Sequence, residues 1–204
     1  MKKRTRIGVP ERRQQIIDAT REITLERGVH DLRISDVAEA LDVSTGLIHY
    51  HFDTRDELIE AMLRETAVAD IDTFKETLTS STTPEDRLAR LIDYYLPSSH
   101  RDPAWMLWID VWGDALRDRN IERISKRIDM AWMDVLEDVI AEGAEAGSFR
   151  CDDPSDAAWR IGGLLDGLAL QLVLHQGVLS RARVLRLVRH AAAVELGVEL
   201  LERR

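Results

Sequence analysis

Apolar residues recur at helical spacing along almost the whole of this 204-residue chain. The first such stripe runs from Ile16 to Ile23, and no segment alternates apolar and polar residues over a useful length, as a half-buried strand would. The prolines agree with this pattern, because none needs to interrupt a long periodic stretch and three stand where a helix is expected to begin. The chain is therefore predicted to be all-α.

The periodic stretches and the signals at their ends predict about nine helices. Gly28 is expected to end the first helix, and a polar segment from Thr79 to Pro84 separates the fourth from the fifth. The expected helices cover about residues 10–27, 34–41, 45–51, 55–78, 84–96, 103–117, 121–146, 154–176 and 180–200.

The distribution of charge separates the start of the chain from the rest. The whole chain carries a net charge of -9, which taken alone argues against nucleic acid as a partner. Residues 1–55, however, hold ten basic and nine acidic residues, whereas residues 56–204 hold 18 and 28. The acidity belongs to the larger C-terminal part, and the N-terminal part must be interpreted separately.

Cysteine content and hydropathy narrow the class of protein further. The single Cys151 excludes an internal disulfide framework and any cysteine-rich zinc site. The basic start of the chain has no apolar segment behind it, so no signal peptide is expected. The most apolar run, from Leu164 to Leu174, is interrupted by Asp166 and Gln171, and no membrane-spanning helix is expected. A cytoplasmic location fits these features.

Two short helices separated by a tight turn are predicted within residues 34–51. Ser44 is a good N-cap for the second helix, and Asp42 can adopt the left-handed conformation that such a turn often needs. This is the helix-turn-helix pattern, in which the first helix braces the second and the second presents one face to base edges in the major groove of DNA. The alternative is a helical hairpin that packs an aromatic patch internally.

The second of these helices has an apolar side and a polar side. Leu47, Ile48 and Phe52 are expected to anchor it on the core. The small Gly46 allows a close approach to a base or to the DNA backbone, and the tyrosine and histidine side chains can hydrogen-bond phosphate oxygens. The residues that remain for DNA are Thr45, Gly46, His49, Tyr50 and His51.

The segment from Ile34 to Ile59, ISDVAEALDVSTGLIHYHFDTRDELI, resembles the DNA-binding signature of the TetR family of transcriptional regulators. The resemblance covers about residues 10–63. It implies that the second helix reads bases, and that the start of the first helix and the residue that opens the following helix also touch DNA. The DNA-binding residues that it implies are Ser35, Thr45, Gly46, His49, Tyr50, His51 and Arg55.

Four positions depart from the family pattern. His49 stands where a tyrosine is frequent, Asp42 where glycine is common, and Arg33 where a serine or threonine cap is frequent. Arg55 stands where lysine is usual, which keeps the charge. These changes leave the motif intact, but the family pattern no longer predicts the operator sequence.

Three later segments look like the C-terminal domain of the branch of this family that contains the choline and betaine-pathway repressor. They are Trp108–Asp118, Gly147–Phe149 and Leu165–Gln171. The resemblances together imply a helix-turn-helix DNA-binding domain at residues 1–55 and a helical effector-binding and dimerisation domain at residues 56–204.

Tryptophans and a carboxylate indicate where an effector would bind. Trp105, Trp108 and Trp112 share a helix face, which is either core or the wall of a pocket. Asp166 stands among leucines and needs a partner, which could be an internal arginine, a helix N-terminus or a ligand cation that tryptophan faces also attract. A cationic small molecule is therefore the effector hypothesis. Its predicted binding residues are Trp108, Trp112, Asp166 and Gln171.

The last two expected helices carry apolar stripes. Two such helices from each of two chains would form a four-helix bundle, and burial within one chain is the alternative. A two-fold dimer also doubles the specificity that one short helix offers on a palindromic operator. The predicted homodimer contacts are Leu168, Leu172, Leu187, Val188, Ala191 and Val194.

These features favour a ligand-responsive transcriptional regulator, a repressor that a small-molecule effector releases from its operator. An enzyme is the second class, but no nucleophile elbow, phosphate-binding loop or metal-spaced histidine pair recommends it, and no cofactor or metal is expected. A ligand-binding adaptor without DNA binding is the third class, and the intact segment 44–55 speaks against it. The basic tail at Lys2–Arg6 is either an arm that contacts DNA or a solvated terminus.

Overall fold

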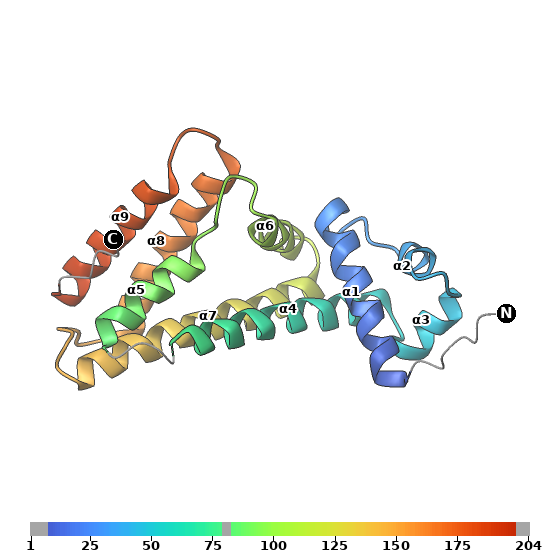
Figure 1. Cartoon of the computed structure of the whole chain (residues 1–204), viewed down its shortest axis with the longest axis horizontal. Helices are drawn as coiled ribbons and strands as arrows, with labels where there is room; N and C mark the ends of the chain where they lie inside the picture. The colour runs from blue at the N-terminus through green and yellow to red at the C-terminus, as the bar shows by residue number, and fades with distance from the viewer. Residues whose placement is uncertain (1–7, 79–82, 199–204) are drawn as a thin grey trace. The chain divides into compact units, whose positions relative to one another are not determined.

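The computed structural model describes residues 8–78 and 83–198, and every regular element within them is an α-helix (Figure 1). All nine predicted helices are present in this part of the chain, so the predicted all-α fold is confirmed. The basic tail at Lys2–Arg6 lies outside the described residues. The helices are α1 Val9–Arg27, α2 Ile34–Ala40, α3 Thr45–His51, α4 Arg55–Leu78, α5 Pro84–Tyr95, α6 Pro103–Ala115, α7 Arg119–Glu145, α8 Pro154–Leu174 and α9 Arg181–Leu196.

The described residues form two compact units. The first holds the residues up to Ala67 together with Leu107–Ser125, and the second holds Val68–Met106 and the residues from Lys126 onward. Three helices, α4, α6 and α7, each contribute residues to both units. The predicted domain boundary at residue 55 falls inside the first unit, because the start of α4 and the turn between α6 and α7 belong to the same compact unit as α1, α2 and α3. The division into functional domains therefore stays a prediction.

The core of the first unit joins α1, α3 and the start of α4. Ile16 and Ile17 of α1, Ile48 of α3, and Leu58 and Ile59 of α4 are almost completely buried. Helices as short as α2 and α3 are not stable alone in water, so their contacts with one another and with α1 hold them in place.

The turns of the first unit use the local signals expected from the sequence. Gly28 ends α1 with a φ of 83°, which is accessible to glycine without strain. Asp42 adopts the left-handed conformation, with a φ of 52°, between α2 and α3. The Ser44 hydroxyl then accepts a hydrogen bond from the backbone N–H of Leu47 at 3.3 Å, as the predicted N-cap of α3. The helix-turn-helix geometry thus follows from residues that are adjacent in the sequence.

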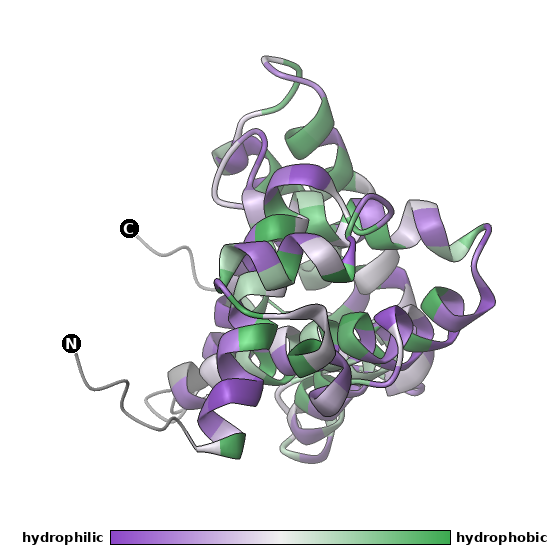
Figure 2. Cartoon of the chain, turned by 90° about the vertical axis from the view of Figure 1, so that its right-hand side faces the viewer, coloured by the Kyte–Doolittle hydropathy of each residue, from purple (hydrophilic) through white to green (hydrophobic). Residues whose placement is uncertain are grey.

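In the second unit, α9 lies beside both α8 and α5 (Figure 1). Hydrophobic and hydrophilic residues occur on the same helices (Figure 2), as amphipathic helices require when one face packs on a core. Arg181, in the first turn of α9, donates from Nη2 to the Asp93 carbonyl at 2.7 Å and from Nε to the Pro97 carbonyl at 3.2 Å. The first bond satisfies a carbonyl that the last turn of α5 leaves free, and the second holds the residue that follows the C-cap, so together they fix that end of the helix.

Helix α8 is more apolar than the sequence analysis predicted. By length and composition alone it is apolar enough to cross a membrane, and it is the one helix of the described residues that is. The core helix of a soluble protein passes the same test, and 44% of the apolar stretch of α8 is buried within the chain. The interruption by Asp166 and Gln171 is therefore weaker than the sequence suggested, because the rest of the helix is strongly apolar.

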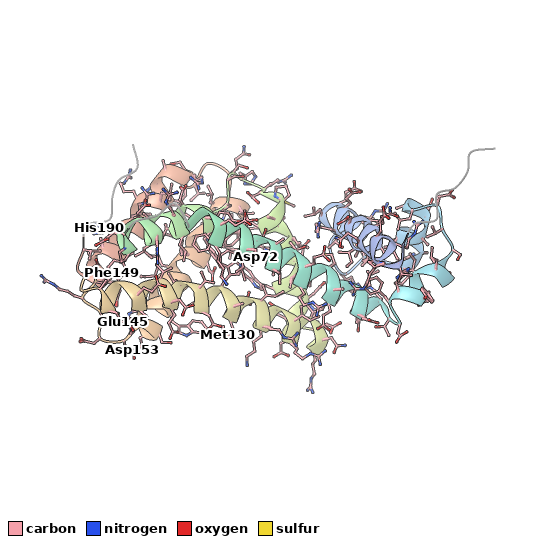
Figure 3. All side chains as sticks on the ribbon, turned by 60° about the horizontal axis from the view of Figure 1, so that its bottom comes forward. Asp72, Met130, Glu145, Phe149, Asp153 and His190 are labelled. Atoms are coloured by element: carbon pink, nitrogen blue, oxygen red, sulfur yellow. The ribbon has the colours of Figure 1, made fainter. Side chains whose placement is uncertain are left out.

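Gly143 allows a close approach between the end of α7 and the loop that follows it. The Phe149 backbone N–H donates to the Gly143 carbonyl at 3.0 Å, and the Phe149 side chain (Figure 3) is buried. A Cβ atom added at Gly143 would overlap the Phe149 ring, with only 2.8 Å to Cγ. The ring could move only by disturbing its other neighbours in the core.

We expect Gly143→Ala to lower the free energy of unfolding by about 1–3 kcal/mol, because it overpacks this contact. Gly113→Ala in α6 is the matched control, since a Cβ there meets nothing within 4 Å. The control should be neutral or raise stability by roughly 0.5–1 kcal/mol, the usual gain from replacing glycine in a helix. Urea denaturation followed by circular dichroism measures both, and equal effects of the two substitutions would contradict the packing described for Phe149.

Candidate functional sites

The polar face of α3 is open to solvent. Ile48 and Phe52 are buried and Leu47 is half-buried, so the expected apolar side of the helix does face the core. The Tyr50 side chain is 71% exposed, an unusual position for a large aromatic residue. The predicted DNA-binding residues that are exposed in the structure are Ser35, Thr45, Gly46, His49 and Tyr50.

His51 is half-buried at the end of α3, next to a basic part of α1. Burial, and then the charges of Arg13 and Arg12, lower the pKa of the imidazole below its ordinary value of 6.5. The Arg13 guanidinium lies over the Phe52 ring, with Cζ 4.6 Å from the ring centroid. The Tyr50 ring meets the His51 ring edge to face at 5.1 Å. The sequence analysis did not select Arg13, although the density of basic residues before position 14 was a signal for it.

Arg55 has an internal role in the structure. Its Nε donates to the Leu32 carbonyl at 2.8 Å, and its Nη2 donates to the carbonyls of Val29 at 2.6 Å and His30 at 3.0 Å. Three bonds from one guanidinium hold the loop between α1 and α2 against the start of α4. The resemblance implied a DNA contact for Arg55. The three bonds use the Nε and Nη2 donors, and Nη1 lies 3.6 Å from a carboxylate oxygen of Asp56, so the DNA contact of Arg55 stays a prediction.

The second unit contains a carboxylate paired with a tyrosine. Asp166 of α8 accepts a hydrogen bond from the Tyr95 hydroxyl at 2.7 Å. Of the partners considered for Asp166, neither an arginine nor a helix N-terminus is the one observed. Burial raises the pKa of Asp166, the bond from Tyr95 lowers it, and the charge of Asp129 raises it again. Burial and the Asp166 charge raise the pKa of Tyr95 well above its ordinary value, so this hydroxyl stays protonated and remains a donor.

Aromatic rings lie around the Tyr95 member of this pair. The Tyr95 ring lies edge to face with Trp105 at 5.6 Å and with Trp132 at 5.5 Å. Phe74 and Tyr94 extend the cluster, with centroids 6.0 Å and 6.2 Å from that of Trp132. We call these five residues the aromatic cluster. A half-buried carboxylate bonded to a tyrosine that stands within a group of aromatic rings is an environment that favours an organic cation.

Backbone contacts fix the position of Trp105 in the cluster. Its indole N–H donates to the Tyr95 carbonyl at 3.1 Å. Asp102 caps the start of α6, where it accepts bonds from the backbone N–H groups of Ala104 at 3.0 Å and Trp105 at 3.3 Å. The same carboxylate accepts from the Ser98 hydroxyl at 2.6 Å. Trp105 is therefore held by the ends of both α5 and α6.

The predicted effector residues are divided between the two units. Trp108 and Trp112 belong to the first unit, and Asp166 and Gln171 belong to the second. Gln171 is exposed and its side-chain oxygen lies 3.0 Å from Nδ1 of His175, so it does not join Asp166. Tyr95 and Trp132 were missed, because no periodicity of α5 or α7 distinguishes them from ordinary core residues.

The predicted dimer face is partly buried within the single chain. Leu172 and Val188 are buried, because the inner sides of α8 and α9 pack on each other and on the rest of the second unit. These two residues therefore belong to the core of the chain, which is the alternative that periodicity left open. Leu168 and Ala191 are half-buried, and Leu187 and Val194 are 40% and 71% exposed.

Comparison with known proteins finds two family matches along the chain. Residues 16–62 match the family of bacterial regulatory proteins named after TetR, and residues 84–197 match the C-terminal region of BetI-type transcriptional repressors. The transcriptional regulator BetI of Escherichia coli K12 is 27% identical over 186 residues, which cover 88% of this chain and 91% of BetI.

Two solved structures share the fold over nearly the whole chain. A putative transcriptional regulator from Saccharomonospora viridis, solved in complex with choline, is 26% identical with a TM-score of 0.76, covering 95% of this chain and all of its own. A putative TetR-family regulator from Rhodococcus sp. is 25% identical with a TM-score of 0.79, covering 92% of this chain and all of its own. With an intact helix-turn-helix and a matching C-terminal region, the chain belongs to the TetR family of transcriptional regulators and carries a C-terminal domain of the BetI type.

Proposed function

We propose that this regulator is a homodimeric repressor that binds a palindromic operator through α3 and is released when an organic cation binds beside Asp166. The observation that carries the proposal is the Tyr95–Asp166 pair within the aromatic cluster. The choline complex of the Saccharomonospora viridis regulator supports the same class of effector. The proposal also includes a cytoplasmic location, where a DNA-binding repressor acts.

The chemistry of the cluster suits a quaternary ammonium group. Such a cation has no N–H donors, so it is recognised by charge and by the negative faces of aromatic rings rather than by hydrogen bonds. Asp166 supplies a half-buried carboxylate, whose partial loss of water is costly until a positive charge compensates it. Asp129 adds a second negative charge that acts on both Asp166 and Tyr95. Trp105 and Trp132 offer the rings.

Release from DNA needs only a difference in cation affinity between two states of the dimer. A conformation that binds the cation more tightly is populated at the expense of the one that fits the operator. Two copies of α3 must be spaced to enter successive major grooves, so a small change in that spacing lowers operator affinity. The exposed apolar residues Leu187 and Val194 on α9 are the proposed contacts between the two chains.

We expect His49→Ala and Tyr50→Ala to weaken operator binding roughly tenfold or more, because contacts of this kind contribute about 1–3 kcal/mol each. The measurement is fluorescence anisotropy with a duplex from the DNA upstream of the protein's own gene. His175→Ala, which removes an exposed imidazole from the second unit, is the matched control and should bind like the wild type. Unchanged affinity in both α3 variants would show that the exposed face of α3 does not touch DNA.

We expect Asp166→Asn to weaken binding of choline roughly tenfold or more, because it removes the charge that faces the cation. Tryptophan fluorescence measures the titration, since Trp105 and Trp132 lie in the cluster. Asp152→Asn, at an exposed loop position before α8, is the matched control.

The neutral carbon isostere of choline should bind weakly to wild-type protein. Cation affinity should also fall as the pH is lowered through the pKa of Asp166, which burial has raised, because protonation removes the same charge. Equal affinities for choline and its isostere would contradict the proposal.

We expect Val194→Glu to shift the protein from dimer to monomer, because it places a charge in an apolar interface while a position this exposed tolerates it in the single chain. Light scattering coupled to size-exclusion chromatography measures the mass. Leu116→Glu is the matched control, since Leu116 belongs to the first unit and is 84% exposed. A dimer that survives Val194→Glu would place the interface elsewhere.

A further inference from the structure

A basic group that has no acidic partner within residues 8–78 and 83–198 lies where α1 meets the end of α3. Its members are Arg13 of α1 and His51 of α3, with Arg12 acting on His51 as well. Arg13 is held over the Phe52 ring, and Phe52 is itself 1% exposed, so the platform beneath the guanidinium is part of the core. A guanidinium on such a platform is restricted in its motion before it meets any ligand.

Two later arginines of α1 are paired with carboxylates, whereas Arg12 bonds the side-chain oxygen of Gln15. Arg21 lies 3.4 Å from a carboxylate oxygen of Asp18, and Arg27 lies 3.7 Å from one of Asp36. Among the described residues, neither Arg13 nor His51 has an ion pair with a carboxylate. The arrangement thus brings a permanent positive charge close to a group that can become positive, without a compensating anion.

An anion is what this arrangement lacks. Two neighbouring cations repel each other, and the repulsion is one reason why His51 stays neutral in the free protein. A phosphate between them would reverse that effect, because it attracts both charges and accepts hydrogen bonds from both side chains. The position at the end of the exposed helix α3 makes the DNA backbone the source of the phosphate.

We propose that Arg13 and His51 together bind one backbone phosphate of the operator, and that DNA binding thereby places a proton on His51. The inference rests on the proposed function, since it needs α3 to lie against DNA. It adds Arg13 of α1 to the residues that contact the operator, and it makes operator affinity depend on pH.

The direction of the pH dependence follows from the proton uptake. The charged groups that act on His51 are Arg13 and Arg12 from α1, and from its own helix Tyr50 meets its ring edge to face. The pKa of His51 lies below 6.5 in the free protein and is raised when the phosphate is bound. Operator affinity should therefore rise as the pH falls between these two pKa values, by at most about tenfold per pH unit for one proton.

The first experiment measures operator affinity and its salt dependence by fluorescence anisotropy with the upstream duplex. Arg13→Ala should weaken binding roughly tenfold and reduce the slope of log affinity against log salt by about one, the loss of one phosphate contact. Arg13→Lys should restore the slope, because it keeps the charge. Arg64→Ala, which removes an exposed arginine from α4, is the matched control and should leave both quantities unchanged. Thermal unfolding checks that each variant folds.

The second experiment compares wild-type protein with His51→Gln at about pH 6 and about pH 8, which bracket the ordinary histidine range. The affinity of wild-type protein should rise more at the lower pH than that of His51→Gln, and the difference isolates His51 from the other histidines. If wild-type protein binds no DNA, the proposed function fails and this inference with it. If wild-type protein binds the duplex but Arg13→Ala matches Arg64→Ala, or if His51→Gln keeps the full pH dependence, this inference is overturned and the proposed function stands.

Discussion

The buried ring of Phe52 is the contact on which the DNA-binding half of the structure depends. It ends α3, and its backbone N–H donates to the Ile48 carbonyl at 3.0 Å. Its side chain is packed in the core, so the opposite, polar face of α3 points toward solvent. The Arg13 guanidinium lies over the Phe52 ring, with Cζ 4.6 Å from the ring centroid. Because α3 has only seven residues, its orientation comes from this packing rather than from its own stability. Every property assigned to the exposed face of α3 therefore depends on a residue that no ligand touches.

The Tyr95–Asp166 pair organises the second unit in a comparable way, but at a greater energetic cost. A half-buried carboxylate is tolerated because a hydroxyl donates to it at 2.7 Å. That single bond leaves most of the acceptor capacity of the carboxylate unused. Arg181 and Asp102 hold the helix ends that carry Tyr95 and Trp105, so the rings around the carboxylate are fixed by backbone contacts. A rigid cluster with a partly satisfied charge is what selective binding of a cation requires.

Sequence patterns predicted the features that depend on neighbouring residues. Ser44, Asp42 and Gly28 act through bonds or backbone angles that span a few positions, so their roles could be stated before the structure was known. The Tyr95–Asp166 bond joins residues 71 positions apart, and no periodicity marks it. Arg55 shows a different limit, because the residue type fits both a phosphate and a set of carbonyls. Leu172 and Val188 show a third, since an apolar stripe does not reveal which chain covers it.

The internal bonds of Arg55 also define how long a segment must be grafted to transfer the DNA-reading residues to another regulator. Here the loop from Val29 to Leu32 is tied to the start of α4 through Arg55, and Phe52 is shared between α3 and the arginine of α1 that lies over it. A functional graft would therefore carry the segment from Val29 to Arg55 as one module, together with a basic residue at position 13. A shorter exchange would move the reading residues without the framework that aims them.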